Sequence, residues 1–294
     1  MKKSKKLRKL LEIDKILVVP GAPNALTAIL IEKTGFEAVY MSGAGTSYSM
    51  LGRPDIGLLT MSEMVMNARY IARATNIPVI ADADTGYGNA INVMRTVEEF
   101  ISAGVAAVHI EDQVSPKRCG HIEGKELISV EEMVGKIRAA DRVRRETDPD
   151  FILIARTDAR TAIGGSLDEV IKRAKKYIEA GADIIFPESP LSVDEMRILT
   201  KSIEAPLIAN MVVGGKTPYL SANELQEIGY KIVIFPNSCL KYAMRAISDL
   251  LKELKVKGTD KDFIPKMYSL KETFDLLGYE EIKRFENEFL PKNR

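Results

Sequence analysis

Short apolar segments alternate with amphipathic segments along most of the chain. A glycine suited to end the preceding helix, or a proline, stands directly before most of the apolar segments. Together with one segment near the start, this rhythm predicts eight strands, at residues 16–19, 36–40, 79–81, 105–110, 151–154, 182–186, 207–209 and 230–235. Apolar residues at helical spacing between them predict helices such as 89–103, 130–145 and 166–180.

Short and almost wholly apolar strands that alternate with helices are typical of a parallel sheet covered by helices. Eight such units predict an α/β fold of the (β/α)8 TIM-barrel type. An open, doubly wound sheet is the alternative, but no GxGxxG motif follows the first strand. Further helical patterns occupy 264–277 and 280–289. We expect one barrel domain over 1–294, with a C-terminal helical extension from about 258–294 that packs on the barrel or on a neighbouring subunit.

Composition excludes several classes of protein. The chain has 294 residues, 46% of them hydrophobic, and a net charge of +1 from 42 basic and 41 acidic residues. Such a balance gives no field that selects nucleic acid or a membrane surface. The basic start lacks the apolar segment of a signal peptide, and no apolar stretch reaches the length of about 18 residues that a membrane span needs. Two cysteines make no disulfide framework, so we expect a cytoplasmic protein without nucleic-acid or membrane partners.

Polar residues stand in succession at the carboxyl ends of six predicted strands, which is where a barrel of this type has its active site. They are Tyr40 and Ser42, Asp82 and Asp84, His109, Glu111 and Asp112, Arg156 and Asp158, Glu188, and Asn210. One such residue could cap a helix, but capping does not explain six strands. The sequence therefore predicts an active site at this end. For His109 a place in the core is an equal alternative.

Two carboxylates separated by one residue, Asp82 and Asp84, project to the same side of an extended strand. With Glu111 they offer the oxygen ligands that a hard divalent cation prefers, so we expect Mg2+, or Mn2+ in its place. The alternative for Asp84 is that it caps the turn at 85–88. The two histidines and two cysteines of the chain lack the spacing of a zinc site.

A basic loop with a cysteine, Lys117-Arg118-Cys119-Gly120-His121, follows the fourth predicted strand. Neighbouring cations predict a lowered pKa for the thiol, which suits proton transfer near neutral pH. Gly120 and Gly124 would let the loop fold tightly over a substrate. The alternative is a solvated loop whose cysteine packs as a small apolar residue.

Two glycine-containing segments could contact an anionic substrate. Residues 42–47 follow the second strand and lead into a loop that carries Asp55. Their backbone N–H groups could bind a carboxylate or phosphate, although such turns also occur for steric reasons alone. Residues 214–218 follow Asn210 and are the second such segment.

The ordered motifs resemble the isocitrate lyase and phosphoenolpyruvate mutase superfamily, and within it most closely the 2-methylisocitrate lyases. They are Asp-Ala-Asp-Thr-Gly-Tyr-Gly at 82–88, His-Ile-Glu-Asp-Gln at 109–113 and Lys-Arg-Cys-Gly-His at 117–121. The resemblance covers roughly residues 15–290. It implies a barrel whose last helix is exchanged between the subunits of a homotetramer.

The resemblance also implies roles for the residues at the strand ends. Asp82 would bind Mg2+ directly, and Asp84 and Glu111 through water. The substrate would be held by Ser42, Gly43, Ala44, Arg156, Glu188 and Asn210, with Asp55 on a nearby loop. Cys119 would be the catalytic acid, on a mobile loop shaped by Lys117, Gly120 and His121. Tyr40 is the candidate base.

The implied activity is a Mg2+-dependent retro-aldol cleavage of 2-methylisocitrate to pyruvate and succinate, a step of the methylcitrate cycle in propionate catabolism. Two features differ from the 2-methylisocitrate lyases. Residues 210–218 are more similar to the 2,3-dimethylmalate lyase and oxaloacetate hydrolase branch. Lys241, near the end of the eighth strand, stands where an arginine is expected, which weakens a bidentate contact to a substrate carboxylate.

Several alternatives follow from these differences. They are 2,3-dimethylmalate lyase, oxaloacetate hydrolase, a phosphonomutase and, more distantly, a barrel without catalytic activity. The cysteine loop separates the lyases from the phosphonomutases without choosing among lyases. A non-catalytic barrel would be expected to lose the metal carboxylates or the thiol, and Asp82, Asp84, Glu111 and Cys119 are all present.

Overall fold

The computed structural model describes residues 1–291. It contains two compact units, Met1–Leu240 and Lys241–Arg294. The first unit contains all eight predicted strands, which are β1 (Leu17–Pro20), β2 (Val39–Met41), β3 (Val79–Asp82), β4 (Ala107–Glu111), β5 (Ile152–Thr157), β6 (Ile184–Pro187), β7 (Ile208–Asn210) and β8 (Ile232–Phe235).

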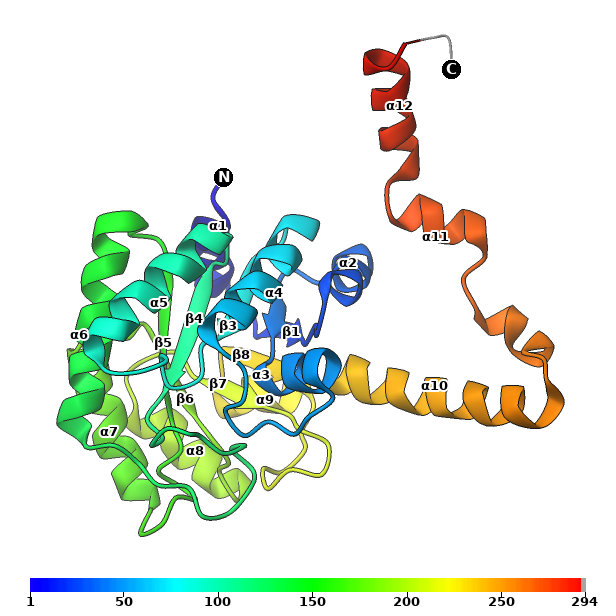
Figure 1. The fold of residues 1–294 in the computed structure, drawn as a ribbon. Helices are drawn as coiled ribbons and strands as arrows, with labels where there is room; N and C mark the ends of the chain where they lie inside the picture. The colour runs from blue at the N-terminus through cyan, green and yellow to red at the C-terminus, as the bar shows by residue number, and fades with distance from the viewer. Residues whose placement is uncertain (292–294) are drawn as a thin grey trace. The chain divides into compact units, whose positions relative to one another are not determined.

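Helices precede and separate the strands of the first unit (Figure 1). They are α1 (Lys3–Glu12), α2 (Ala25–Lys33), α3 (Gly43–Thr46), η1 (Ser47–Leu51), α4 (Met61–Ala74), α5 (Ala90–Ala103), α6 (Val130–Thr147), α7 (Leu167–Glu179), α8 (Val193–Ser202) and α9 (Ala222–Ile228). Local chemistry sets their ends. Ser166 caps α7 by accepting a hydrogen bond from the Glu169 N–H, and Gly104 ends α5 in the left-handed conformation that the sequence predicted for it.

The strands form a closed parallel ring. β2 to β6 pair in sequence order, and β1, β8 and β7 form a second sheet. Single parallel bridges, Gly21 to Tyr40 and Ile185 to Leu207, join the two sheets at both seams. The ring excludes the open-sheet alternative and confirms the predicted (β/α)8 barrel.

Side chains that alternate along each strand divide the core into two parts. One cluster contains the inward row, including Val19, Ile80, Ile154 and Ile234, and fills the barrel. The other contains the outward row and the helix residues that pack on it. Leu7 of α1 belongs to the inner cluster and is fully buried, so α1 closes the amino end of the barrel.

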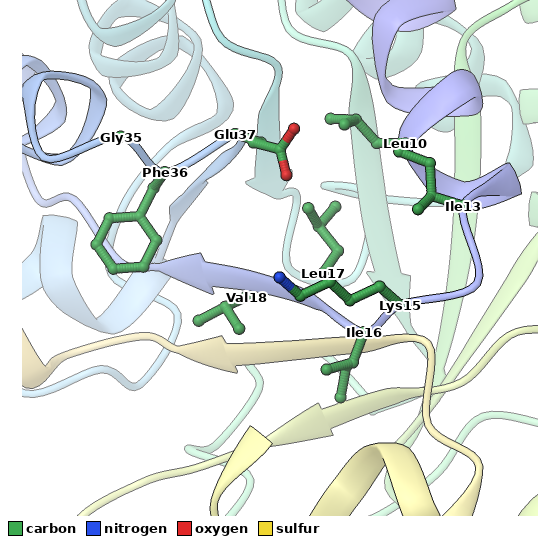
Figure 2. A pocket seen from close by; sticks show the side chains of 9 residues that line it. All are labelled: Leu10, Ile13, Lys15, Ile16, Leu17, Val18, Gly35, Phe36 and Glu37. Atoms are coloured by element: carbon green, nitrogen blue, oxygen red, sulfur yellow. The ribbon is translucent and has the colours of Figure 1, made fainter. Parts of the chain in front are cut away.

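A small cavity of about 220 Å3 also lies at the amino end. The end of α1, the start of β1 and the segment 35–37 line it (Figure 2). Its lining is mostly apolar, with Lys15 and Glu37 as the charged side chains. These residues lie before the strands or at the start of β1, so the cavity is separate from the carboxyl ends where the candidate site lies.

Up to residue 291, the second unit consists of helices and short connections. It continues α10 (Ser238–Lys257), which begins in the first unit, and adds η2 (Lys261–Lys266), α11 (Leu270–Leu276) and α12 (Tyr279–Phe289). The predicted helix at 280–289 is confirmed. The predicted helix at 264–277 is broken, because Ser269 caps a new helix in a reciprocal capping box with Glu272.

Apolar side chains of the second unit, such as Leu251 and Phe285, are exposed, and none of its residues up to 291 is buried. The predicted C-terminal extension from about 258 lies within this unit. Over residues 1–291, no helix is long and apolar enough to cross a membrane.

Candidate active site

The inward row of each strand changes from apolar to polar as the strand approaches its carboxyl end. Ile80 is followed two residues later by Asp82, Ile154 by Arg156, and Phe186 by Glu188. Pairing in register sets Asp82 beside His109 and Glu111 beside Arg156. The predicted strand-end residues are therefore gathered at one end of the barrel, where they are buried except for the half-buried Asn210. Asp112 is the exception in direction, because its carboxylate bonds to Arg173 and Tyr177 of α7 outside the barrel interior.

Asp82 is fixed by backbone hydrogen bonds on both carboxylate oxygens. Its Oδ1 accepts from the Asp84 N–H at 3.0 Å, and its Oδ2 accepts from the Gly43 N–H at 3.0 Å. Burial favours the neutral acid, but His109, Lys117 and Arg156 around it lower the pKa of Asp82 to about 2. Asp82 is therefore an oriented anion.

Glu111 has no such support. Neither carboxylate oxygen makes a hydrogen bond, and Arg156 Nε lies 3.3 Å from Oε2. Burial raises the pKa of Glu111 well above its usual range, although Arg156 acts against it. Leaving a buried carboxyl without partners is costly, and a cation beside it would remove that cost. The donor set of Asp82, Asp84 and Glu111 thus fits a hard divalent cation with water among its ligands.

The side chains of the protein alone do not form a complete set of metal ligands. Within the described part of the chain, no group of three or more His, Cys, Asp or Glu side chains is arranged to hold a metal ion. Water-mediated ligation by two of the three carboxylates, which the family resemblance implies, is compatible with this arrangement.

Lys117 joins the cysteine loop to the carboxylates. Its Nζ lies 2.8 Å from Asp84 Oδ1 and 2.6 Å from Asp55 Oδ1, and the side chain is buried. Burial favours the neutral amine, yet Asp84 and Asp55 outweigh it and hold the pKa of Lys117 well above its usual value. Burial also raises the pKa of Asp84 to about 6, although Lys117 acts against it. Asp84 therefore contributes to the charged site and is more than a turn cap.

Gly120 is packed against the strand ends so closely that no side chain fits there. A Cβ at this position would lie 2.3 Å from Arg156 Nη2 and 2.7 Å from Glu188 Cγ. Its carbonyl accepts hydrogen bonds from Ser189 Oγ at 3.2 Å and from Lys125 Nζ. The loop is thus closed over the carboxyl end in this structure.

His121 brings two loops together. Its Nδ1 accepts a hydrogen bond from the Lys216 N–H at 3.1 Å and lies 3.1 Å from Ser189 Oγ, while Nε2 lies 3.4 Å from Glu188 Oε1. Because Nδ1 accepts from a backbone N–H, the imidazole proton is on Nε2. Burial lowers the pKa of His121, so the ring is neutral. The segment 214–218 contacts the cysteine loop, as its predicted place beside the site requires.

The predicted pKa shift of Cys119 is wrong in sign. Burial raises the pKa of the thiol above its usual value. Lys117 is directed to Asp55 and Asp84, and Arg118 is exposed and lies over Gly124. Lys117 and Arg118 are neighbours of the cysteine in sequence, but their charged groups are directed away from its thiol. Cys119 is consequently a protonated thiol at neutral pH.

Arg156 is held by Glu111 of β4 and by the acids that directly follow β5 and β6. Its Nε and Nη2 donate to Asp158 at 2.9 and 3.1 Å, and Nη2 lies 3.3 Å from Glu188 Oε2. Phe186 lies under the guanidinium, 5.1 Å from ring centroid to Cζ. Asn210 Nδ2 donates to Glu188 Oε2 at 3.0 Å, and the Asn210 Oδ1 has no partner. The predicted substrate-lining residues Arg156, Glu188 and Asn210 are therefore in mutual contact.

The segment after β2 uses part of its hydrogen-bonding capacity internally. Ser42 Oγ accepts from the Gly45 N–H at 3.1 Å as the cap of α3, and the Gly43 N–H is bonded to Asp82. Tyr40 OH lies 2.7 Å from His109 Nε2, with both side chains buried. Burial raises the pKa of Tyr40 well above its usual value, so the phenol is protonated. The structure places His109 in the site beside Asp82.

The sequence pattern did not indicate two polar side chains of the site. Lys125 and Ser189 both bind the Gly120 carbonyl. Neither stands at a position that strand periodicity singles out, and a lysine in a loop is ordinarily expected in solvent. Lys241, which was predicted to contact substrate, lies in the second unit, and its role stays a prediction.

Comparisons with known proteins show what this chain is similar to. The model of the phosphoenolpyruvate phosphomutase family matches residues 7–255. The 2,3-dimethylmalate lyase of Eubacterium barkeri is 50% identical over 289 residues, which cover 98% of this chain and 99% of that protein. The 2-methylisocitrate lyase of Aeropyrum pernix is 49% identical over 278 residues, which cover 95% and 88%.

Solved structures of similar fold cover nearly the whole chain. A crystal structure of 2,3-dimethylmalate lyase has a TM-score of 0.93 and 38% identity, covering 100% of this chain and 97% of that one. Phosphonopyruvate hydrolase in complex with oxalate and Mg2+ has a TM-score of 0.89 and 33% identity, covering 99% and 100%. With the closed barrel and its carboxyl-end carboxylates, these matches establish that the chain belongs to the phosphoenolpyruvate mutase/isocitrate lyase superfamily.

Proposed function

We propose that the protein is a Mg2+-dependent carbon–carbon lyase that cleaves 2-methylisocitrate to pyruvate and succinate. The observation that supports this best is the position of Cys119. The loop that carries its protonated thiol is fastened over the carboxyl ends of the strands by Lys117, Gly120 and His121. A half-buried acid on a loop closed over the carboxylate cluster suits a reaction in which a carbanion must be protonated away from bulk water.

Asp82, Asp84 and Glu111 would hold the cation, and the unpartnered oxygens of Glu111 support that assignment. Mn2+ has the same preference for oxygen ligands and could replace Mg2+. When bound, the cation would polarise the hydroxyl oxygen of the substrate and stabilise the negative charge that develops on it. A relative of known structure binds oxalate together with Mg2+, which also supports the assignment.

The side chains around the cluster would orient the substrate. Arg156 offers a guanidinium beside Glu188 and Asn210, and a carboxylate of the substrate could accept from it and from the backbone of the segment that begins at Ser42, Gly43 and Ala44. Such contacts fix the bond to be broken against the thiol. Orientation of this kind contributes a large part of the rate enhancement of many enzymes.

Side chains of this chain would accept the proton from the substrate hydroxyl and supply the proton to the carbanion. The hydroxyl proton of the substrate would leave toward Tyr40, whose own proton can pass to His109 Nε2 at 2.7 Å. The bond between the hydroxyl-bearing carbon and its neighbour then breaks, and its electron pair passes to that neighbour and its carboxylate. The Cys119 thiol gives its proton to the same carbon, which completes succinate. When the loop opens, His109 releases its extra proton and the thiolate regains one, which restores the starting protonation states.

A second candidate substrate is 2,3-dimethylmalate, which bears a methyl group where 2-methylisocitrate has a carboxymethyl group. Two observations favour it: the 50% identity to a 2,3-dimethylmalate lyase over 99% of that protein, and the pairing of the site's cations. Lys117, Lys125 and Arg156 already pair with carboxylates of the chain. The third carboxylate of 2-methylisocitrate would need another donor.

The substrate assay distinguishes these candidates. Pyruvate release is measured by a coupled assay with Mg2+ from 2-methylisocitrate, isocitrate and 2,3-dimethylmalate side by side. Preference for 2-methylisocitrate that EDTA abolishes supports the proposal, whereas preference for 2,3-dimethylmalate establishes the second candidate. Cleavage of none of the three would contradict both and direct the search to oxaloacetate and phosphonates.

The assembly belongs to the same proposal. A homotetramer with exchanged C-terminal helices would cover the exposed apolar side chains of the second unit, such as Leu251 and Phe285. Light scattering coupled to size-exclusion chromatography gives the mass in solution. A mass of one chain at micromolar concentration would contradict this part of the proposal.

A further inference from the structure

A fully buried ammonium group lies behind the cysteine loop. The Lys125 side chain has 0% exposure, and its Nζ contacts three acceptors: the Gly120 carbonyl, Asp158 Oδ1 at 2.9 Å and Thr161 Oγ1 at 2.8 Å. Three acceptors match the three N–H donors of an ammonium group. Two of them, Asp158 and Thr161, come from the chain that follows β5, and one comes from the loop beside Cys119.

Asp158, one of these acceptors, is itself fixed by further hydrogen bonds. Its carboxylate also accepts from Arg156 Nε at 2.9 Å and Nη2 at 3.1 Å, and its backbone N–H donates to Asp112 Oδ1 at 3.0 Å. Burial favours the neutral acid, but Arg156 and Lys125 hold the pKa of Asp158 well below its usual value. One carboxylate therefore fixes both a predicted substrate-binding guanidinium and the ammonium group of Lys125.

The ammonium is not needed to form the hairpin on which Lys125 stands. Backbone pairing holds that hairpin, with the Val114 N–H donating to the Glu126 carbonyl at 2.8 Å and a bridge between Gln113 and Leu127. The Lys125 backbone is fixed separately, because its carbonyl accepts from the Ile163 N–H at 2.9 Å. The side chain is therefore not required for the hairpin, and its ammonium links the Gly120 carbonyl of the loop to Asp158 and Thr161.

We infer that Lys125 is a positioning residue that anchors the closed loop through the Gly120 carbonyl and thereby holds the adjacent Cys119 thiol at the strand ends. The inference rests on the proposed function of Cys119 as the acid. Without the ammonium, the Gly120 carbonyl keeps Ser189 Oγ at 3.2 Å as its partner. The loop would then open more often, and the thiol would spend less time where it can protonate the carbanion.

Lys125→Met tests this anchor, because methionine keeps most of the length and removes the charge. Asp158 retains Arg156 as its partner, so the barrel should fold. We expect kcat to fall 10- to 100-fold, with KM changed less than threefold, because the chemical step and not substrate binding loses its geometry. Lys3→Met is the matched control, since Lys3 donates to the Ala72 and Thr75 carbonyls elsewhere in the barrel unit.

Alkylation of the thiols gives a readout that needs no substrate. Iodoacetamide labelling is followed by peptide mass spectrometry, with Cys239 as the internal reference. The expected result is a rate for Cys119 at least fivefold faster in Lys125→Met than in wild type, with Cys239 unchanged and both rates unchanged in Lys3→Met. An unchanged Cys119 rate in a folded Lys125→Met variant would overturn the inference, as would equal acceleration of both cysteines.

The two readouts separate this inference from the proposed function. Faster Cys119 labelling with no cleavage of any tested substrate by wild type would leave the anchor standing and refute the reaction. Should Lys125→Met fail to fold, Thr161→Val decides, because it removes one acceptor and no charge. It should accelerate Cys119 labelling at least twofold, and an unchanged rate would overturn the anchor.

Discussion

Lys117 Nζ lies 2.8 Å from Asp84 Oδ1, so the closed cysteine loop places a buried ammonium against one of the carboxylates assigned to the metal. The pair joins two segments that are 33 residues apart in the chain, and Asp55 at 2.6 Å adds a third. Closure of the loop and ionisation of Asp84 therefore stabilise each other. An ammonium in this place also repels a divalent cation.

Lys117→Met should consequently separate metal binding from catalysis. Removing the like charge should tighten Mg2+ binding, while loss of the ion pairs to Asp84 and Asp55 should weaken loop closure and lower kcat by at least about tenfold. Calorimetric titration with Mg2+ and the pyruvate assay measure the two effects. Equal losses of Mg2+ affinity and activity would argue that Lys117 acts only by supporting the fold.

Cys119→Ser should fold normally and lose most cleavage. A serine hydroxyl is a far weaker acid than the thiol, and loss of a general acid typically costs about 10²–10⁴-fold in rate. The pyruvate assay gives the rate, and circular dichroism and the melting temperature check the fold. Cys239→Ser is the matched control and should retain wild-type turnover. Full activity of Cys119→Ser would remove this residue from the mechanism.

The protonated state of Cys119 predicts the pH dependence. Burial raises the pKa of the thiol in the folded protein above its unfolded value. The neutral thiol therefore stabilises the fold fully below the unfolded pKa, and this contribution is lost as the pH rises through the folded pKa. Activity that needs the thiol should persist through neutral pH and fall only in the alkaline range. The measurement is kcat against pH at saturating substrate and Mg2+. A kcat that already decreases with rising pH below pH 7 would contradict this assignment.

The sequence predicted the site at the carboxyl ends of the strands, because polar residues follow the apolar segments there. Strand alternation explains why several of these side chains point into the barrel. Asp82, Arg156 and Glu188 share the parity of buried apolar residues two positions earlier, and eight parallel strands bring their ends together. The pKa of Cys119 could not be predicted in this way. Its sign depends on where the side chains of Lys117 and Arg118 go, and the first is drawn to Asp55 and Asp84 from other loops.

The burial of Lys125 could not be predicted from the sequence either. Lysine is rarely fully buried, so pattern alone assigns this residue to solvent. Its burial depends on three acceptors that only the tertiary fold assembles around it. The break between η2 and α11 is different, because the Ser269 and Glu272 capping box is visible in the sequence as a helix start.

Gly120→Ala should prevent the loop from closing. The added Cβ would lie 2.3 Å from Arg156 Nη2, and the guanidinium cannot move without losing its two hydrogen bonds to Asp158. We expect kcat to fall by about 10²-fold, since a 1 Å displacement of a reacting group costs about that much. Gly135→Ala is the control, because a Cβ there meets nothing within 4 Å and alanine favours the helix α6. Its activity should equal that of wild type, and equal activity of Gly120→Ala would show that the closed loop has room to shift.

Glu111→Gln should weaken the stabilisation that Mg2+ gives to the fold. A cation that binds only the native state raises the free energy of unfolding by about 2.7 kcal/mol at 100 times its Kd. Glutamine keeps the shape of Glu111 but removes one negatively charged metal ligand. The rise in melting temperature that Mg2+ causes should therefore be smaller. Because both Glu111 oxygens lack hydrogen bonds and burial raises its pKa, the variant should also be at least as stable as wild type without metal. Thermal melts with and without Mg2+ measure both effects, with the exposed Glu98→Gln as control. A Mg2+-induced shift as large in Glu111→Gln as in Glu98→Gln would exclude Glu111 from the metal site.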